Sequence, residues 1–202
     1  MAQSHYFIND DTVASDIKSY IFEYGGHSFT FRTDRGVFSR GKADGESSVL
    51  LDVMAEKLAD KDSVNFLDLG CGYGFIGIVW KRLFPDCRVV MSDVNSRAVL
   101  LAKSNAALNK TDTQVILCGG IPETDEKYDV IALNPPIHAG KRVMYELYEQ
   151  AARAVSENGG FYVVIAEKHG AGSTETELRR IFSEVTRVYK KKGIYVFKGV
   201  KR

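Results

Sequence analysis

The sequence predicts an α/β fold in which a mostly parallel sheet is covered by helices on both faces. Three observations support this prediction. From residue 64 onward, short apolar runs alternate with segments of helical periodicity, as expected for βαβ units. A glycine-rich loop separates the first of these runs from the helical segment that follows it. The C-terminal region has instead the pattern of a β-hairpin, which must place one antiparallel strand in the sheet.

The composition is ordinary for a soluble globular domain. The chain has 202 residues, of which 45% are hydrophobic and 26% charged, and a net charge of +1 neither indicates nor excludes a nucleic-acid partner. The three cysteines are widely spaced without a C-x-x-C pair, so we expect no disulfide framework and no metal. Neither a signal peptide nor a membrane-spanning run is recognisable, which favours a cytoplasmic protein without membrane contact.

The first 45 residues differ from the rest and are expected to form a small β-meander appendage to a main domain over residues 46–202. Residues 17–24 are rich in aromatic and β-branched side chains, and Gly25-Gly26 interrupts them. Residues 27–32 alternate strictly between apolar and polar, and a turn then leads to Val37-Phe38-Ser39 as a third strand.

The main domain is expected to begin with a helix, because Val49, Leu50, Val53, Met54 and Leu58 share one face at helical spacing. A capping box from Thr174 to Glu177 is expected to open the last helix. The further strands are predicted at 64–69, 88–92, 114–117, 128–133 and 161–166, the further helices at 75–83, 97–108, 143–155 and 175–182, and the hairpin strands at 185–189 and 194–197.

The glycine-rich loop has the spacing of a nucleotide-binding turn. Gly72 to Gly77 fits G-x-G-x-x-G between a strand and a helix, and Asp93 follows the next strand, where a carboxylate can bind both hydroxyls of a ribose. A dinucleotide and S-adenosylmethionine both fit this pattern. Asp68, just ahead of the glycines, favours S-adenosylmethionine, because a carboxylate repels a pyrophosphate and attracts an ammonium or a sulfonium.

A second motif, Asn134-Pro135-Pro136-Ile137, follows the apolar run 128–133. Two prolines cannot continue a central strand, so they form a stiff loop at its carboxyl end, where open α/β sheets bind their ligands. An amide side chain beside a backbone carbonyl can accept hydrogen bonds from a planar amine. This motif indicates an enzyme that acts on an exocyclic or amide nitrogen.

Together these motifs resemble class I S-adenosylmethionine-dependent methyltransferases. The shared pattern is D-x-G-x-G-x-G, an Asp after the second strand and N-P-P after the fourth, over about residues 25–200. Within that class the chain is similar to short, single-domain members of the RsmC-type group, which methylates the 2-amino group of guanine in small-subunit ribosomal RNA. The segments that carry this similarity are Gly36–Ser39, Asp44-Gly45, Asn134–Lys141 and Gly193–Tyr195.

The resemblance implies a Rossmann-like methyltransferase fold with a seven-stranded sheet, and it makes residues 46–202 a domain that binds S-adenosyl-L-methionine. The residues implied in cofactor binding are Asp68, Gly70, Cys71, Gly72, Gly74, Asp93, Val94 and Asn134. The implied catalytic segment is Asn134, Pro135, Pro136 and Ile137. Two positions depart from the family pattern: Cys118-Gly119-Gly120 stands where a polar side chain usually lies near adenine, and Ile137 stands where many N-methyltransferases have an aromatic residue.

The resemblance also implies the reaction and the partner. The reaction is direct in-line methyl transfer to the 2-amino group of a guanine in 16S ribosomal RNA, with ribosomal RNA or the small ribosomal subunit as partner. The sequence does not distinguish a monomer from a homodimer. We expect no obligatory catalytic histidine, and His138 is the competing candidate for a base. The candidate RNA contacts are Arg40, Lys42, His138, Lys141 and Lys168.

Three alternatives remain open at this point. The N-P-P motif also serves enzymes that methylate adenine in nucleic acids or glutamine amides in proteins. A non-catalytic methyltransferase-like domain that binds RNA is a second possibility, although the glycine loop and Asn134 are both intact. A nicotinamide-dependent oxidoreductase is a third, but it offers no role for Asn134-Pro135-Pro136.

Overall fold

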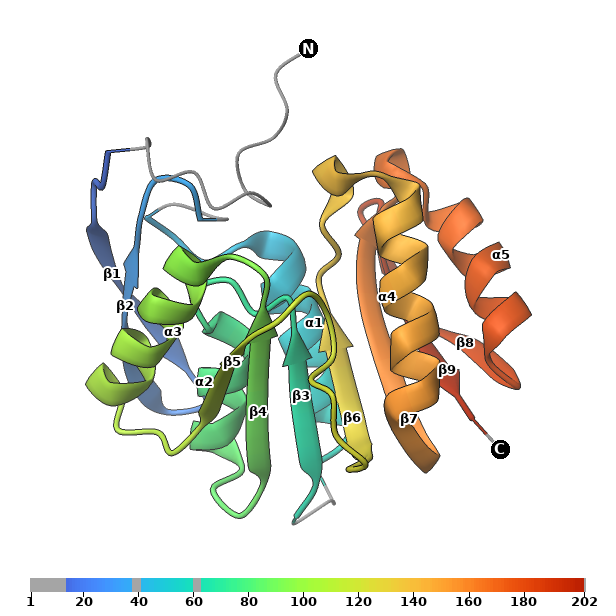
Figure 1. The fold of residues 1–202 in the computed structure, drawn as a ribbon, viewed down its shortest axis with the longest axis horizontal. Helices are drawn as coiled ribbons and strands as arrows, with labels where there is room; N and C mark the ends of the chain where they lie inside the picture. Colours follow the sequence, from blue (N-terminus) through green and yellow to red (C-terminus); the bar gives the residue numbers. More distant parts are fainter. Residues whose placement is uncertain (1–13, 38–40, 60–62, 202) are drawn as a thin grey trace.

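The central element of the computed structural model, which describes residues 14–37, 41–59 and 63–201, is a seven-stranded sheet (Figure 1). The strands are β3 (Asn65–Leu69), β4 (Arg88–Asp93), β5 (Gln114–Leu117), β6 (Tyr128–Leu133), β7 (Val155–Ala166), β8 (Glu184–Lys191) and β9 (Ile194–Val200). Their order is β5-β4-β3-β6-β7-β9-β8, and β9 is the one strand that runs opposite to the other six strands of this sheet. The predicted seven-stranded fold with one antiparallel strand from a C-terminal hairpin is therefore confirmed.

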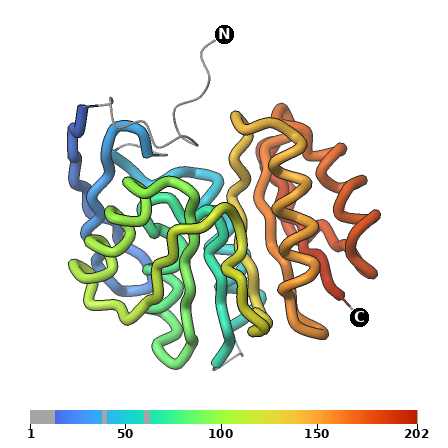
Figure 2. Tube along the Cα trace, in the orientation of Figure 1, coloured from blue at the N-terminus to red at the C-terminus, as the bar shows by residue number. Residues whose placement is uncertain are grey.

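Helices cover both faces of the sheet, as the tube in Figure 2 also shows. They are α1 (Gly45–Lys57), α2 (Phe75–Leu83), α3 (Ser96–Leu108), α4 (Lys141–Ala154) and α5 (Ala171–Ile181), with short 3-10 turns at Ile137–Ala139 and Glu167–His169. The buried side chains form two clusters. One lies between the sheet and α1, α2 and α3, and the other lies between the sheet and α4 and α5.

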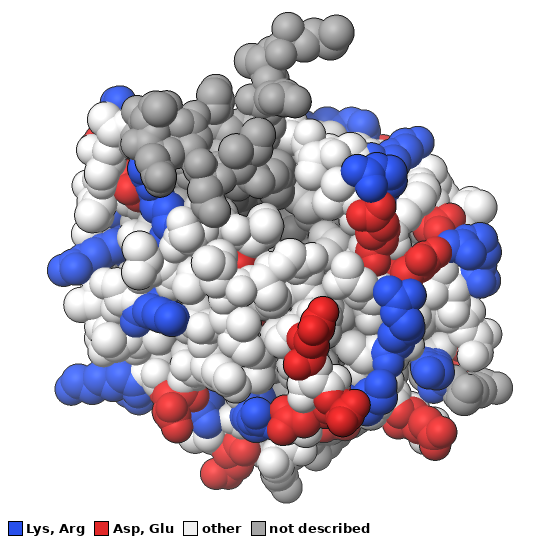
Figure 3. Space-filling view, in the orientation of Figure 1, with Lys and Arg blue, Asp and Glu red and all other residues white. Residues whose placement is uncertain are grey.

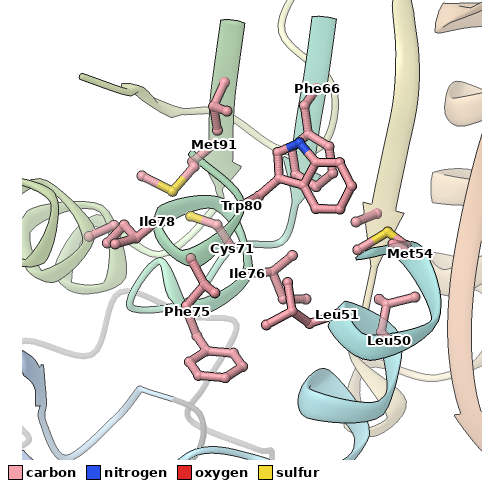
Figure 4. Packing of buried hydrophobic residues seen from close by; sticks show 14 of the residues in the cluster. Leu50, Leu51, Met54, Phe66, Cys71, Phe75, Ile76, Ile78, Trp80 and Met91 are labelled. Carbon is pink, nitrogen blue, oxygen red and sulfur yellow. The ribbon is translucent and has the colours of Figure 1, made fainter. Parts of the chain in front are cut away.

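The first cluster packs tightly beneath the glycine loop. The ring of Trp80 on α2 stacks on Phe66 of β3, with centroids 4.8 Å apart and planes 12° apart. Leu50, Leu51 and Met54 of α1 are completely buried in the same cluster, and Figure 4 shows these side chains meeting between the two helices and the strands. Close packing of this kind holds both helices, and the loops at their N-termini, in fixed positions.

The N-terminal region contains a two-stranded hairpin, β1 (Lys18–Tyr24) and β2 (His27–Thr33). The predicted meander is correct for these two strands. Phe38 and Ser39 of the predicted third strand lie outside the described residues. Val37 lies in a bend, and its N–H donates to the Asp34 carbonyl at 3.3 Å. The described part of this region is therefore a hairpin.

The hairpin packs against the glycine loop through aromatic rings. Phe75, the first residue of α2, meets the edge of Phe22 at 4.9 Å between centroids and lies 5.5 Å from Phe31. The hydroxyl of Tyr20 lies 2.8 Å from the hydroxyl of Tyr73, which is itself only 3% exposed. Tyr73 is thus a packing residue, and the hairpin supports the loop from behind.

Asn105 of α3 and Asn109, the C-cap of that helix, complete the edge of β2. Asn105 is fully buried, accepts a hydrogen bond from the N–H of Arg32, and donates to the carbonyls of Arg32 and Tyr73, each at 2.9 Å. One turn later, Asn109 makes the equivalent pair with Thr30 at 2.9 Å in an exposed setting. These side chains satisfy backbone groups that an adjacent strand would otherwise pair.

Replacing Asn105 by alanine is expected to destabilise the fold by about 1–3 kcal/mol, because backbone groups of Arg32 and Tyr73 lose their partners in a buried setting. Asn109→Ala is the matched control, and it should cost less because water replaces its exposed bonds. Urea unfolding monitored by the fluorescence of Trp80, the single tryptophan, measures both values. Equal decreases in unfolding free energy for the two variants would show that burial does not strengthen the contribution of the Asn105 hydrogen bonds.

Two local predictions need correction. The capping box at Thr174 is wrong, because α5 begins at Ala171 with Gly170 as its N-cap, and the buried Thr174 hydroxyl instead lies 3.4 Å from that of Tyr148. Strand β7 also begins earlier than the predicted residue 161. Val155 pairs with Tyr128 ahead of an irregularity, and regular pairing with β6 resumes at Gly160.

In the described ranges no helix is both long and apolar enough to cross a bilayer.

Candidate active site

The candidate site lies at the carboxyl ends of three neighbouring strands. The order β4-β3-β6 places Asp93, the glycine loop and Asn134 at one edge of the sheet, although they are distant in sequence. In Figure 1 the arrowheads of these strands point to that edge. Parallel α/β sheets bind their ligands at this position.

Asp68 closes the N-terminus of α2. Its Oδ2 accepts a hydrogen bond from the N–H of Gly77 at 2.8 Å, and Gly77 is the third residue of the helix. This is the kind of N–H that a pyrophosphate needs at a helix N-terminus. The buried carboxylate of Asp68 already occupies this position. It would repel the pyrophosphate of a dinucleotide and attract a positively charged ligand.

Asp93 joins the glycine loop to the end of β4. Its two carboxylate oxygens accept from the N–H groups of Gly72 and Asn95, each at 2.8 Å. Asn95 in turn caps α3 by accepting from the N–H groups of Arg97 and Ala98. Each oxygen of Asp93 keeps a lone pair for a further donor, so the side chain can still accept from two vicinal hydroxyls.

Open space lies over the glycines of this edge. A Cβ atom on Gly72 or on Gly119 would meet no heavy atom within 4 Å, and one on Gly70 would meet only Leu133 at 3.8 Å. Gly70 and Gly72 also have φ angles of +69° and +56°, which disfavour other residues. Beside them, Val94 leaves 43% of its surface exposed, as expected for a residue that packs on a flat apolar ligand.

Three carboxyl groups at this edge have raised pKa values. Burial raises the pKa of Asp68 to about 7, against the opposing effect of the Gly77 N–H, and nearby Asp93 adds to the rise. Burial likewise raises the pKa of Asp93 and that of Glu46 in the first turn of α1. A bound cation would stabilise the ionised forms of these groups, so the edge suits a positively charged ligand.

Asn134 is oriented by two residues of α1 and its cap. Its Nδ2 donates to Oδ2 of Asp44 and to Oγ of Ser47, each at 2.9 Å. Pro135 is buried, and the carbonyl of Pro136 accepts from the N–H of Ala139 at 3.0 Å. Both hydrogens of the amide are thus used inside the protein, and its oxygen remains available to accept from a ligand.

The other predicted site residues differ in burial. Cys71 is buried in the first cluster, its N–H donates to the Ser92 carbonyl at 2.9 Å, and its carbonyl accepts from the Gly74 N–H at 2.9 Å. Ile137 is half-buried beside the second cluster, whereas His138, Lys141 and Lys168 are exposed around the edge. Lys42 is exposed just before α1, and Arg40 lies outside the described residues.

Sequence reasoning missed the roles of Ser47 and Asn95, and it reached Asp44 only as part of a family segment. A signal existed for the caps, since Asp44 and Asn95 each precede a helix as preferred N-cap residues. No signal existed for the contact of α1 with Asn134, which joins residues 87 and 90 positions apart.

Comparison with known proteins identifies the family. The model of the methyltransferase small domain matches residues 28–198. The protein YbxB of Bacillus subtilis, described as uncharacterized, is 36% identical over 200 residues, which is 98% of both chains. The ribosomal RNA small subunit methyltransferase C of Vibrio cholerae is 30% identical over 73% of this chain and 43% of its own length. The large subunit methyltransferase G of Shewanella woodyi is 29% identical over 90% of this chain and 45% of its own.

Solved structures agree with this assignment. The 16S rRNA N2 methyltransferase RsmC of T. thermophilus, in complex with AdoMet and guanosine, superimposes with a TM-score of 0.82 at 26% identity, over 92% of this chain and 51% of that one. The ribosomal protein L11 methylase of Lactobacillus delbrueckii, at 20% identity and a TM-score of 0.67, shares the fold. This chain therefore spans nearly all of YbxB and about half the length of the ribosomal RNA methyltransferases. It belongs to the methyltransferase small domain family and is an S-adenosylmethionine-dependent methyltransferase related to the RsmC-type enzymes.

Proposed function

We propose that this enzyme methylates the exocyclic 2-amino group of a guanine in ribosomal RNA. The observation that carries the proposal is the orientation of Asn134, whose Nδ2 is held by Asp44 and Ser47. The side-chain oxygen is thereby left to accept a hydrogen bond from a substrate. A group that presents N–H donors, such as a planar amine, complements this oxygen.

The described residues fit S-adenosylmethionine at the glycine-rich edge. Asp68 and the backbone of Gly70 and Gly72 would hold its methionine end, and the Asp93 carboxylate would hold its ribose hydroxyls. Gly74 acts as the N-cap of α2, because its N–H donates to the Cys71 carbonyl and its carbonyl accepts from the Ile78 N–H. Val94 would pack on the adenine, whose edge would be read by the backbone at Cys118 and Gly119. When bound, the cofactor supplies an electrophilic methyl group on a sulfonium sulfur.

Two acceptors would then prepare the target nitrogen. The Oδ1 of Asn134 and the carbonyl of Pro135 would each accept one N–H of the amine, since the Pro136 carbonyl is already paired with Ala139. These two hydrogen bonds would favour a tetrahedral geometry at the amine nitrogen. The nitrogen lone pair would then be less delocalised into the guanine ring and would point toward the methyl group. The acceleration comes from positioning and electrostatics, and it requires no strong base.

The choice of guanine in ribosomal RNA rests on the relatives. The T. thermophilus RsmC structure contains guanosine, and the Vibrio and Shewanella relatives are methyltransferases of small-subunit and large-subunit RNA. A base must leave its stack in the RNA to reach such a site. Lysine and arginine side chains around the site would then hold the RNA phosphates. Lys42, Lys141 and Lys168 are the candidates, because all three are exposed near the edge. The face of the molecule shown in Figure 3 carries charges of both signs.

Transfer of a labelled methyl group to ribosomal RNA from cells that lack this protein tests the proposal. Naked 16S RNA, naked 23S RNA and assembled subunits are incubated with the enzyme and tritiated S-adenosylmethionine, and the product nucleosides are identified by mass spectrometry. We expect N2-methylguanosine, with Asn134→Ala as the inactive control.

Other products would redirect the assignment. N6-methyladenosine would indicate an adenine enzyme, and label in protein would indicate a glutamine amide as the acceptor. Tight cofactor binding without transfer to any of these substrates would favour a non-catalytic RNA-binding domain.

A further inference from the structure

We propose that Asp44 and Ser47 are positioning residues that determine which end of the Asn134 amide faces the substrate. This inference rests on the proposed function of Asn134 as an acceptor. Asp44 is the N-cap of α1, and Ser47 is the third residue of that helix. Their contacts link the first turn of α1 to the loop after β6.

The Asp44 carboxylate permits only one of the two orientations of the Asn134 amide. An ionised carboxylate can accept hydrogen bonds but cannot donate them. Its Oδ2 accepts from Nδ2 of Asn134 at 2.9 Å and from the N–H of Ser47 at 2.8 Å. If the amide were rotated by half a turn, its oxygen would face this carboxylate oxygen without a hydrogen between them. The carboxylate therefore excludes the rotated form, in which the substrate would meet an N–H₂ group.

Ser47 supplies the second acceptor. It is 6% exposed, and its Oγ receives the other Nδ2 hydrogen at 2.9 Å. The two acceptors fix both the rotation of the amide and its position relative to α1. Either contact alone would leave the amide more freedom, so the two residues act together.

The position of α1 is itself fixed by packing. Leu50, Leu51 and Met54 of this helix are fully buried against the sheet and α2 (Figure 4). The Asp44 side chain also caps the helix, which places its charge at the positive end of the helix dipole. The acceptor pair is consequently part of a rigid element, as a precise catalytic geometry requires.

Asp44→Asn is the discriminating variant, because asparagine caps a helix as well as aspartate does. The introduced amide can donate as well as accept, so it no longer excludes the rotated form of Asn134. We expect turnover to fall about 10- to 100-fold, as for a misplaced catalytic group, with unchanged affinity for S-adenosylmethionine and an unchanged thermal midpoint. Ser47→Ala should produce a smaller loss of the same kind. Asp52→Asn removes the same charge from an exposed position on α1 and should leave turnover unchanged.

An exchange of the two side chains tests whether the contact itself matters. In Asn134→Asp two carboxylates face each other, and turnover should be low. In the double variant Asp44→Asn/Asn134→Asp, the introduced amide can donate to the introduced carboxylate, whose other oxygen can still accept from the amine. We expect the double variant to exceed Asn134→Asp by about tenfold or more in turnover. A purely capping role for Asp44 predicts no such recovery.

A measurement without RNA separates this inference from the proposed function. In ¹⁵N-labelled protein, the side-chain amide pair of Asn134 is identified by its absence in Asn134→Ala. We expect both hydrogens to exchange slowly with water in the native protein and faster in Asp44→Asn. Unchanged exchange together with native turnover in Asp44→Asn would overturn the inference. If no RNA is methylated by the native enzyme but the exchange behaves as expected, the proposed substrate fails while the positioning role stands.

Discussion

Replacing Asn134 by alanine is expected to lower methyl transfer about 10²–10³-fold at saturating cofactor and RNA, the loss typical for removal of one preorganised polar group. The variant removes one of the two proposed acceptors of the target amine. It leaves Asp68, Asp93 and the glycine loop untouched, so the affinity for S-adenosylmethionine should stay within about threefold of the native value, a change of less than 1 kcal/mol. Single-turnover transfer and calorimetric titration of the cofactor measure the two quantities separately.

His138→Ala in the same loop is the control for the competing mechanism. His138 is exposed, and the proposed mechanism assigns it no proton to move. Its removal should change turnover by less than about threefold, whereas removal of a general base costs about 10²–10⁴-fold. Near-native turnover in Asn134→Ala combined with a large loss in His138→Ala would overturn the acceptor mechanism and establish the histidine as the base.

In the cofactor-free protein, replacing Asp68 by asparagine is expected to shift the stability difference in favour of the variant as the pH rises from 5 to 8, and it is expected to weaken cofactor binding. The pKa of Asp68 is raised to about 7 in the fold, from an ordinary value near 3.8. Between these values the folded state keeps a proton that the unfolded chain has lost, so the native protein loses stability as the pH rises toward 7. The variant does not titrate there and is spared this loss.

The magnitude follows from the width of that window. From pH 5 to pH 7 the loss accumulates at about 1.4 kcal/mol per pH unit. The difference in unfolding free energy between Asp68→Asn and the native protein should therefore shift by about 2–3 kcal/mol in favour of the variant from pH 5 to pH 8. The asparagine amide can also change the unfolding free energy in a pH-independent way. That contribution is the same at pH 5 and pH 8, so it does not affect the predicted shift.

Cofactor binding should respond in the opposite sense. The ionised carboxylate favours a cation, so the native affinity for S-adenosylmethionine should increase as the pH rises through about 7, where Asp68 ionises. At pH 8 the variant should bind about 10- to 100-fold more weakly, as for loss of a charge-assisted hydrogen bond worth about 1.5–3 kcal/mol.

Urea unfolding and calorimetry at pH 5 and pH 8 measure both effects. Asp129→Asn is the matched control, because Asp129 accepts from Asn65 and Ser156 and is held far from the site, at the start of β6. It should alter stability without altering cofactor affinity. A pH-independent stability difference for Asp68→Asn would contradict the raised pKa, and unchanged cofactor affinity would remove Asp68 from the site.

Most of the fold could be predicted from local patterns. Strands 114–117 and 128–133 and helix 75–83 were predicted with their observed bounds, because short apolar runs or helical periodicity coincide there with a glycine or proline near an end. The capping box at Thr174 failed since Gly170 starts α5 one turn earlier. The early part of β7 was missed because Asn158-Gly159-Gly160 resembles a turn, although Val155 before it and Gly160 at its end both pair with β6.

The candidate site was predictable to the extent that it lies in contiguous motifs. The glycine loop, Asp93 and Asn134 each follow a strand, and the ends of parallel strands meet at one edge of a sheet. The sequence alone therefore determined the class of fold and the cofactor, and it predicted an acceptor for an amine at Asn134.

Only the tertiary structure decided how that acceptor is held. The docking of α1 beside β6 brings Asp44 and Ser47 to the amide of Asn134, and the docking of the hairpin and Asn105 supports the glycine loop from behind. Likewise, the burial that raises the pKa of Asp68 depends on everything packed around it. These features join residues far apart in the chain, and hydrogen bonds and burial of that kind leave no periodic trace in the local sequence.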